Sequence, residues 1–314
     1  MGLFDRLYYG KAGKRDYSEM DMPKTRVSLF FLVLKDHFLD LVKVNLLQLV
    51  FWLPFLVWTY INIVAIQSID AQTLLSAENG ESLLMSEMMS FLFMWLIGVI
   101  PCVAITGPSS AGAAYIMRNW ARDQHAFLFS DFKDAFKSNW KQALLVSVVS
   151  ALVPVFGYAA MVYYGGMASS SIVMIAPMIF VLSAILMWAL MLVLLYPLMV
   201  GYELKSVHLV KNAFLMAAAS LPKMILARII TLIPIIIFAF GLLNGSMTIV
   251  MVISMYYILF GFAFSRLIYA SFANGVFDHF LNPKIEGAQV RQGLRPHMEE
   301  DELFTDDDDD DDEF

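Results

Sequence analysis

The sequence predicts an all-α, polytopic integral membrane protein with six transmembrane helices, and three observations support this prediction. First, 59% of its 314 residues are hydrophobic, so it holds apolar stretches long enough to cross a hydrocarbon core roughly 30 Å thick. Second, all 21 Lys and Arg residues fall on one side when these stretches are taken as spans. Third, the outer segments 67–84, 166–171 and 244–246 carry only acidic charges. Because basic residues stay inside, both termini are expected in the cytoplasm.

The N-terminal segment 1–43 is polar and mixed in charge at its start, with no short apolar run ending in a cleavage site. We therefore expect the first span to be kept as an anchor. Residues 27–43 alternate apolar and charged positions as a helix in the inner interface does. The six expected spans follow from hydropathy and are 44–66, 85–106, 143–165, 172–200, 224–243 and 247–270.

The segment 107–142 is predicted to be the main cytoplasmic loop. Its second half, 130–142, reads as an interfacial helix, because Phe132, Phe136 and Trp140 recur every four residues beside a parallel stripe of lysines. A weaker pattern of the same kind covers 205–222. Three units of interfacial helix plus hairpin are consistent with a degenerate repeat.

The C-terminal segment 276–314 ends in an acidic tail that includes the run Asp306 to Asp312. A block of like charges stays solvated and disordered. The tail region from residue 299 onward contributes 12 of the 28 acidic residues, so the net charge of −7 reflects this tail. The rest of the chain is basic, as a surface on an anionic inner leaflet should be.

The chain lacks the patterns of a catalytic or metal site. Cys102 is the single cysteine, and the five histidines follow no metal-binding spacing. The serines after Gly107-Pro108 lack the spacing of a nucleophile elbow, so small residues that permit close helix packing are the better interpretation. We expect no enzymatic activity, no cofactor, no metal and no nucleic-acid partner.

Few ionisable residues lie inside the spans, which argues against a proton- or ion-coupled carrier. Arg228 lies five residues after Lys223, or about 7.5 Å along a helix, so its side chain is expected to reach back to the inner interface. The alternative is an inner-side ion-pair cluster of Glu203, Arg228 and Arg266.

The stretch that follows the second span carries a family resemblance. Its Arg118-Asn119-Trp120-Ala121-Arg122 and the pattern from Asp131-Phe132 to Asn139-Trp140-Lys141-Gln142 resemble the YesL family of Firmicute membrane proteins. Asn45-Leu46-Leu47 with Leu53-Pro54, and Tyr196-Pro197 with Lys211-Asn212-Ala213, are similar to further family elements, so the resemblance covers most of 38–275. The acidic tail, and the full span that separates Leu53-Pro54 from Gly107-Pro108, depart from the shorter members.

The resemblance implies a domain of unknown function that is commonly encoded beside carbohydrate ABC transporters. We therefore expect a non-enzymatic accessory or regulatory subunit in sugar uptake, in a bacterial plasma membrane, with membrane lipid and ABC-transporter permease subunits or another membrane protein as partners. The alternative is a carrier or channel for a small uncharged solute such as a sugar. Residues expected to dock a partner or fix the loop are Gly107, Pro108, Arg118, Asn119, Arg122, His125, Asp131, Phe132 and Asn139.

Overall fold

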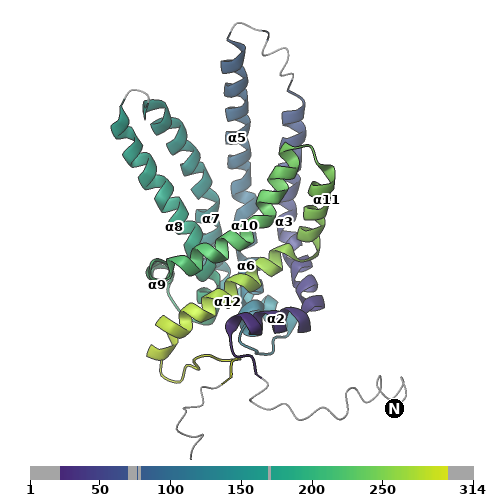
Figure 1. The fold of residues 1–314 in the computed structure, drawn as a ribbon, viewed down its shortest axis with the longest axis vertical. Coiled ribbons are helices and arrows are strands. Elements are labelled where there is room, and N and C mark those ends of the chain that lie inside the picture. Colours follow the sequence, from purple (N-terminus) through teal and green to yellow (C-terminus); the bar gives the residue numbers. More distant parts are fainter. Residues whose placement is uncertain (1–21, 70–75, 77–78, 169–170, 296–314) are drawn as a thin grey trace, which may run out of the picture.

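The computed structural model describes residues 22–69, 76, 79–168 and 171–295, and all regular structure in these ranges is helical (Figure 1). Six helical segments in these ranges are long and apolar enough to cross a membrane, so the predicted spans are confirmed in order. They are Phe38–Gln67, Gly80–Ala104, Leu128–Met167, Ile172–Gly201, Leu221–Leu243 and Met247–Lys284. The start of the N-terminal segment and the acidic tail lie outside the described residues.

Two helices, rather than one, occupy the segment 27–43. Helix α2, Arg26–Asp36, begins after Thr25, whose Oγ1 accepts a hydrogen bond from the Ser28 N–H at 3.1 Å. The chain leaves helical geometry at His37, and α3, Phe38–Gln67, continues directly into the first span. The His37 ring stacks on the buried Trp120, with centroids 4.5 Å apart. The predicted single interfacial helix is therefore wrong in extent.

The predicted loop 107–142 is wrong in being described as a loop throughout, because its first part is a buried helix, and the close helix packing expected after Gly107-Pro108 is confirmed. Helix α5, Gly80–Ala104, is followed at once by α6, Thr106–Trp120, in which 13 of 15 residues are buried. A Cβ on Gly107 would lie 2.3 Å from the carbonyl oxygen of Ala143, which shows how closely α6 approaches the next helix. Small residues permit this approach and contribute little hydropathy, so the segment looked polar in the sequence.

Residues 130–142 do not form a separate interfacial helix, since α7 runs unbroken over Leu128–Ala168. Asp131 helps to start it by accepting a hydrogen bond from the Phe127 N–H at 2.8 Å. Phe132 is buried against Gly112 of α6, while Lys133 and Lys137 are exposed. The apolar stripe therefore packs partly on protein rather than on lipid.

The second half of the chain contains short helices between its spans. After η2, Ile172–Met174, helix α8 covers Ile175–Gly201, and α9, Ser206–Ala219, lies where the sequence predicts a helix over 205–222. Helix α10 covers Leu221–Leu243. The last span consists of α11, Met247–Tyr256, a π-helical turn η3, Tyr257–Gly261, and α12, Phe262–Phe280, before η4, Asn282–Lys284.

The helices meet most tightly at one end of the bundle. Helices α3, α5, α7 and α8 extend away from this end, while α10 and α12 run obliquely across it with α6 among them (Figure 1). The backbone N–H of Arg295 bonds to the Pro23 carbonyl, so both described ends of the chain lie here. We call this the inner end, after the predicted orientation. Both buried hydrophobic clusters include residues of α6 and α12, and α8 contributes the largest share of the first.

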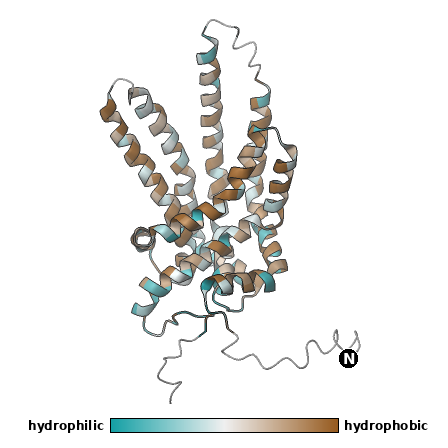
Figure 2. Cartoon of the chain, in the orientation of Figure 1, coloured by the Kyte–Doolittle hydropathy of each residue, from teal (hydrophilic) through white to brown (hydrophobic). Residues whose placement is uncertain are grey.

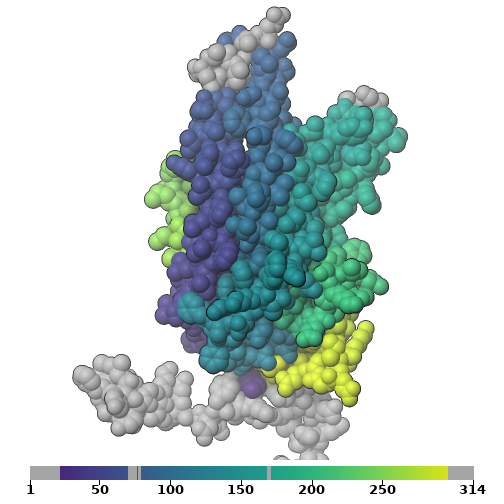
Figure 3. Space-filling model, turned by 180° about the vertical axis from the view of Figure 1, so that it is seen from behind, coloured from purple at the N-terminus to yellow at the C-terminus, as the bar shows by residue number. Residues whose placement is uncertain are grey.

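The outside of the bundle is apolar over most of its length. Figure 2 shows hydrophobic residues along the spans and more hydrophilic ones at the inner end. From behind, α3, α5 and α7 form one continuous surface (Figure 3). Large side chains such as Ile236 and Phe180 are 62% and 76% exposed, which suits contact with lipid.

Candidate functional site

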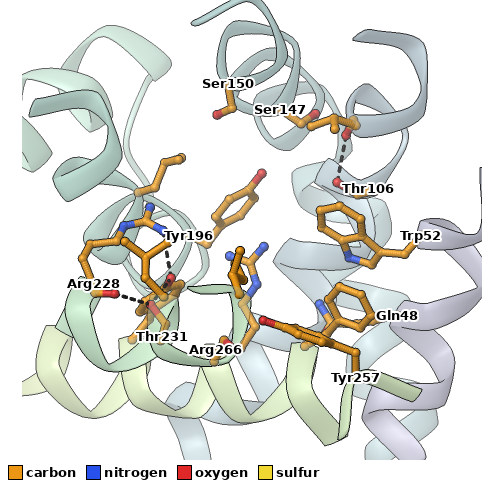
Figure 4. A pocket seen from close by; sticks show the side chains of 17 residues that line it. Gln48, Trp52, Thr106, Ser147, Ser150, Tyr196, Arg228, Thr231, Tyr257 and Arg266 are labelled. Carbon is orange, nitrogen blue, oxygen red and sulfur yellow. Dashed lines mark hydrogen bonds between the residues drawn. The ribbon is translucent and has the colours of Figure 1, made fainter. Parts of the chain in front are cut away.

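A cavity of about 270 Å³ lies where six spans and α6 converge (Figure 4). Its walls come from α3, α5, α6, α7, α8, α10 and the η3–α12 segment. Many lining residues are polar, which is unusual for the interior of a membrane bundle. Besides two arginines, they are Gln48, Thr106, Ser147, Ser150, Tyr196, Thr231, Tyr257, Ser265 and Tyr269.

Arg228 extends from α10 into the bundle and not toward the inner interface. Its Nε donates to the carbonyl oxygen of Ala189 on α8 at 2.5 Å, and its Nη1 donates to the Tyr269 hydroxyl at 2.8 Å. The same hydroxyl lies 2.9 Å from Oγ1 of Thr231. The prediction that Arg228 reaches back to the interface is therefore wrong, because α8 and α12 offer acceptors nearer to it.

Arg266 reaches the same cavity from α12. Its Nη2 donates to Oγ of Ser110 on α6 at 2.7 Å, and its guanidinium carbon lies 4.5 Å from the ring centroid of Tyr196. Tyr196 is 4% exposed. Stacking on an aromatic face is a favourable setting for a guanidinium away from water. The buried helix α6 thus places a hydroxyl directly against a charged group.

The predicted ion-pair cluster of Glu203, Arg228 and Arg266 does not form. Glu203 lines a different pocket at the inner end, with Tyr202 and Lys205. The ion pairs among the described residues join Arg26 to Asp278 and His37 and Lys43 to Asp40, and none includes the two cavity arginines. Arginine keeps its proton in proteins. Two positive charges therefore line one cavity without a carboxylate beside them.

Gln48 of α3 supplies a second unusual feature of the cavity. Its side chain is 0% exposed, and neither its amide nitrogen nor its amide oxygen has a hydrogen-bond partner. A buried polar group without a partner costs about 1–3 kcal/mol. Gln48 was not predicted as a site residue, because it is polar but not ionisable and lies within an apolar span. A glutamine between leucines in the first span was the available signal.

The residues expected to dock a partner are divided between the core and the inner end. Gly107, Pro108, Asn119 and Phe132 are buried, so they are not available to a partner. The backbone carbonyl of Asn119 stabilises the turn after α6, because it accepts hydrogen bonds from the N–H groups of Arg122 and Gln124. Asn139 donates to the Ala135 carbonyl in its own helix, and His125 is exposed with its ring against Phe127.

Arg122 holds the C-terminal segment and Arg118 packs on the turn after α8, so neither projects freely. Arg122 donates from Nη2 to Oε1 of Gln292 at 2.6 Å, and burial, assisted by the charge of Arg118, lowers its pKa. Arg118 lies over the ring of Tyr202, 5.7 Å from its centroid. Burial raises the pKa of Tyr202, so its hydroxyl stays protonated and donates to Asn282 at 2.5 Å.

Comparison with known protein families matches residues 87–161 to the model described as a protein of unknown function, DUF624. No curated protein and no solved structure matches the chain. The matched stretch begins in α5, contains all of α6 and ends in α7, so it includes Ser110, which bonds Arg266, and the cavity residues Ser147 and Ser150. The resemblance drawn from the sequence is confirmed, and residues 87–161 of this membrane protein form DUF624, the uncharacterised domain of the YesL family.

Proposed function

We propose that this protein binds an anionic group, of the carboxylate or phosphate class, in the cavity inside its helix bundle. The observation that carries the proposal is the pair Arg228 and Arg266, which line one cavity with no carboxylate beside them in the part of the chain that the structure describes. A charged side chain within a membrane is costly and is kept where it has a task. Binding an anion there would compensate one of these charges with a carboxylate and both with a doubly charged phosphate.

The hydrogen bonds of the two arginines leave capacity for a ligand. A guanidinium has five N–H donors in a rigid fork. Among the described residues, Arg266 donates one hydrogen bond and Arg228 donates from two of its nitrogens. The remaining donors suit the paired oxygens of a carboxylate or phosphate. The unpartnered amide of Gln48 adds a donor and an acceptor to the same cavity.

An anion fits this cavity better than the uncharged solute of the alternative prediction. A neutral sugar would satisfy hydrogen-bond donors but would leave both positive charges uncompensated in a poorly solvated site. A carrier for an uncharged solute therefore ranks second. The two are separated by testing glucose beside the anions in the assay below.

The test measures thermal unfolding of the purified full chain in a non-ionic detergent, with inorganic phosphate or hexyl phosphate added against sodium chloride of equal ionic strength. A ligand at 100 times its Kd stabilises the folded state by about 2.7 kcal/mol. We expect at least one phosphate probe to raise the unfolding temperature of the wild type and of Lys223→Gln, and to have no such effect on Arg228→Gln with Arg266→Gln.

Lys223→Gln is the matched control, because Lys223 is exposed on the same helix and does not line the cavity. Equal stabilisation of all three proteins by both probes would mean nonspecific binding and would overturn the proposal. An absence of stabilisation with either probe up to its solubility limit would overturn it as well. Stabilisation by glucose alone would favour the uncharged-solute alternative.

For its cellular role we propose a non-enzymatic accessory subunit of carbohydrate uptake in a bacterial plasma membrane, with both termini cytoplasmic, as the family resemblance implies. His125 is the docking candidate that the structure leaves exposed, and its ring contacts Phe127 in the same loop. After crosslinking and mild solubilisation, we expect ABC-transporter permease subunits to co-purify with the wild type and to be lost with His125→Ala. Recovery of the protein alone would remove this role.

A further inference from the structure

The cavity is closed toward the inner end of the bundle and open on another side. Gln48, Tyr196 and Tyr269 in its wall are 0%, 4% and 8% exposed, and α12, which runs across the inner end (Figure 1), lines it together with Thr106 of the buried helix α6. Of the described residues that line it, Leu232 and Ile235 are the ones with exposed side chains, at 42% and 50%. We call these two residues the mouth of the cavity.

The mouth faces hydrocarbon. Ile235 lies 14 residues after the first residue of α10, Leu221, which is about 21 Å of helix at 1.5 Å per residue. The neighbouring Ile233 and Ile236 are 47% and 62% exposed, so the surface around the mouth is apolar. A ligand that passes between Leu232 and Ile235 therefore comes from the bilayer and not from water.

The lining of the cavity becomes more polar from the mouth toward the interior. Gln48 is fully buried and Arg228 and Arg266 are partly buried, and they provide charge and hydrogen-bonding groups, whereas Leu232 and Ile235 at the mouth are apolar and exposed. This gradient matches a molecule with an anionic head and a hydrocarbon tail. A volume of about 270 Å³ holds a small head group and the start of a chain, with the rest of the tail left in lipid.

We propose that the anion is the head group of a membrane lipid, which enters through the mouth with its acyl chains still in the bilayer. This inference rests on the proposed anion-binding function and names the class of ligand. A small head group with a terminal phosphate or carboxylate fits, because the closed side of the cavity leaves no path for a large one.

The experiment is native mass spectrometry of the full chain in detergent after equilibration with phosphatidic acid, phosphatidylcholine and diacylglycerol that share the same acyl chains. We expect one phosphatidic acid retained per protein, at least tenfold more than either other lipid, in the wild type and in Lys223→Gln. Retention should fall about tenfold in Arg228→Gln with Arg266→Gln.

A second pair of variants tests whether the lipid enters the cavity through the mouth. Ile235→Trp narrows the mouth, and we expect it to reduce phosphatidic acid retention severalfold relative to the wild type. Ile236→Trp is the matched control, because Ile236 adjoins the mouth without lining the cavity.

Arginine-dependent stabilisation by inorganic or hexyl phosphate without preferential retention of phosphatidic acid would overturn the lipid inference and leave anion binding intact. Equal loss of lipid from Ile235→Trp and Ile236→Trp would overturn the route through the mouth. Equal retention of diacylglycerol and phosphatidic acid would show an apolar groove only and overturn the inference. No arginine-dependent binding of any probe would remove both proposals.

Discussion

At the scale of single residues, the position of a residue along its helix was predictable, but the direction in which its side chain points was not. The side chain of Arg228 was expected to reach the interface because the residue lies early in its span. That expectation used only its distance from Lys223 along the helix. Its acceptors are the Ala189 carbonyl and the Tyr269 hydroxyl, on two other helices. No local pattern contains those partners, so the convergence of Arg228, Arg266 and Gln48 could not be predicted.

Gly107 carries a prediction at the same scale. Because a Cβ there would meet the Ala143 carbonyl oxygen at 2.3 Å and Oγ of Ser147 at 2.4 Å, Gly107→Ala must push α6 away from α7. We expect a loss of about 1–3 kcal/mol, as overpacked cores show, measured as a lower thermal unfolding temperature in detergent.

The control is Gly165→Ala in α7, where a Cβ meets nothing within 4 Å. Alanine is the better helix former by about 1 kcal/mol, so this variant should be neutral or slightly more stable. If both substitutions had the same effect, the close contact between α6 and α7 would be refuted.

At the scale of elements, the long apolar helices were predictable because hydropathy sums over neighbouring residues. Helix α6 was not, since its Gly, Ala and Ser side chains carry little hydropathy and are buried only because other helices surround them. The break at His37 was missed for a related reason, as His37 stacks on Trp120 of α6. Elements whose burial depends on distant partners leave weak patterns in sequence.

Polar contacts between elements hold the ends of the chain together. Arg26 of α2 pairs with Asp278 of α12 at 2.5 Å and also donates to the carbonyl oxygens of Ala121 and Gln292. Charge-assisted bonds of this kind are stronger than neutral ones. The first and last described helices are therefore linked directly, across the segment that follows α6.

At the scale of the whole molecule, the distribution of Lys and Arg predicts the orientation. We expect Glu81→Cys to react with a membrane-impermeant thiol reagent added to intact cells and Glu286→Cys to react only after lysis, both on a Cys102→Ser background. Both glutamates are exposed and lie at opposite ends of the bundle, at the start of α5 and after η4. The reverse pattern of labelling would invert the topology and place the basic residues outside.

The buried position of α6 has a consequence for biosynthesis. The helices that α6 contacts most, α7, α8 and α12, all follow it in the chain, so the ribosome delivers α6 before most of the surfaces that cover it exist. Until α12 is made, Ser110 lacks its hydrogen-bond partner Arg266, and this run of small, moderately polar residues is only partly covered. A chain truncated before its last helix would therefore leave part of this segment uncovered, with Ser110 lacking its partner Arg266.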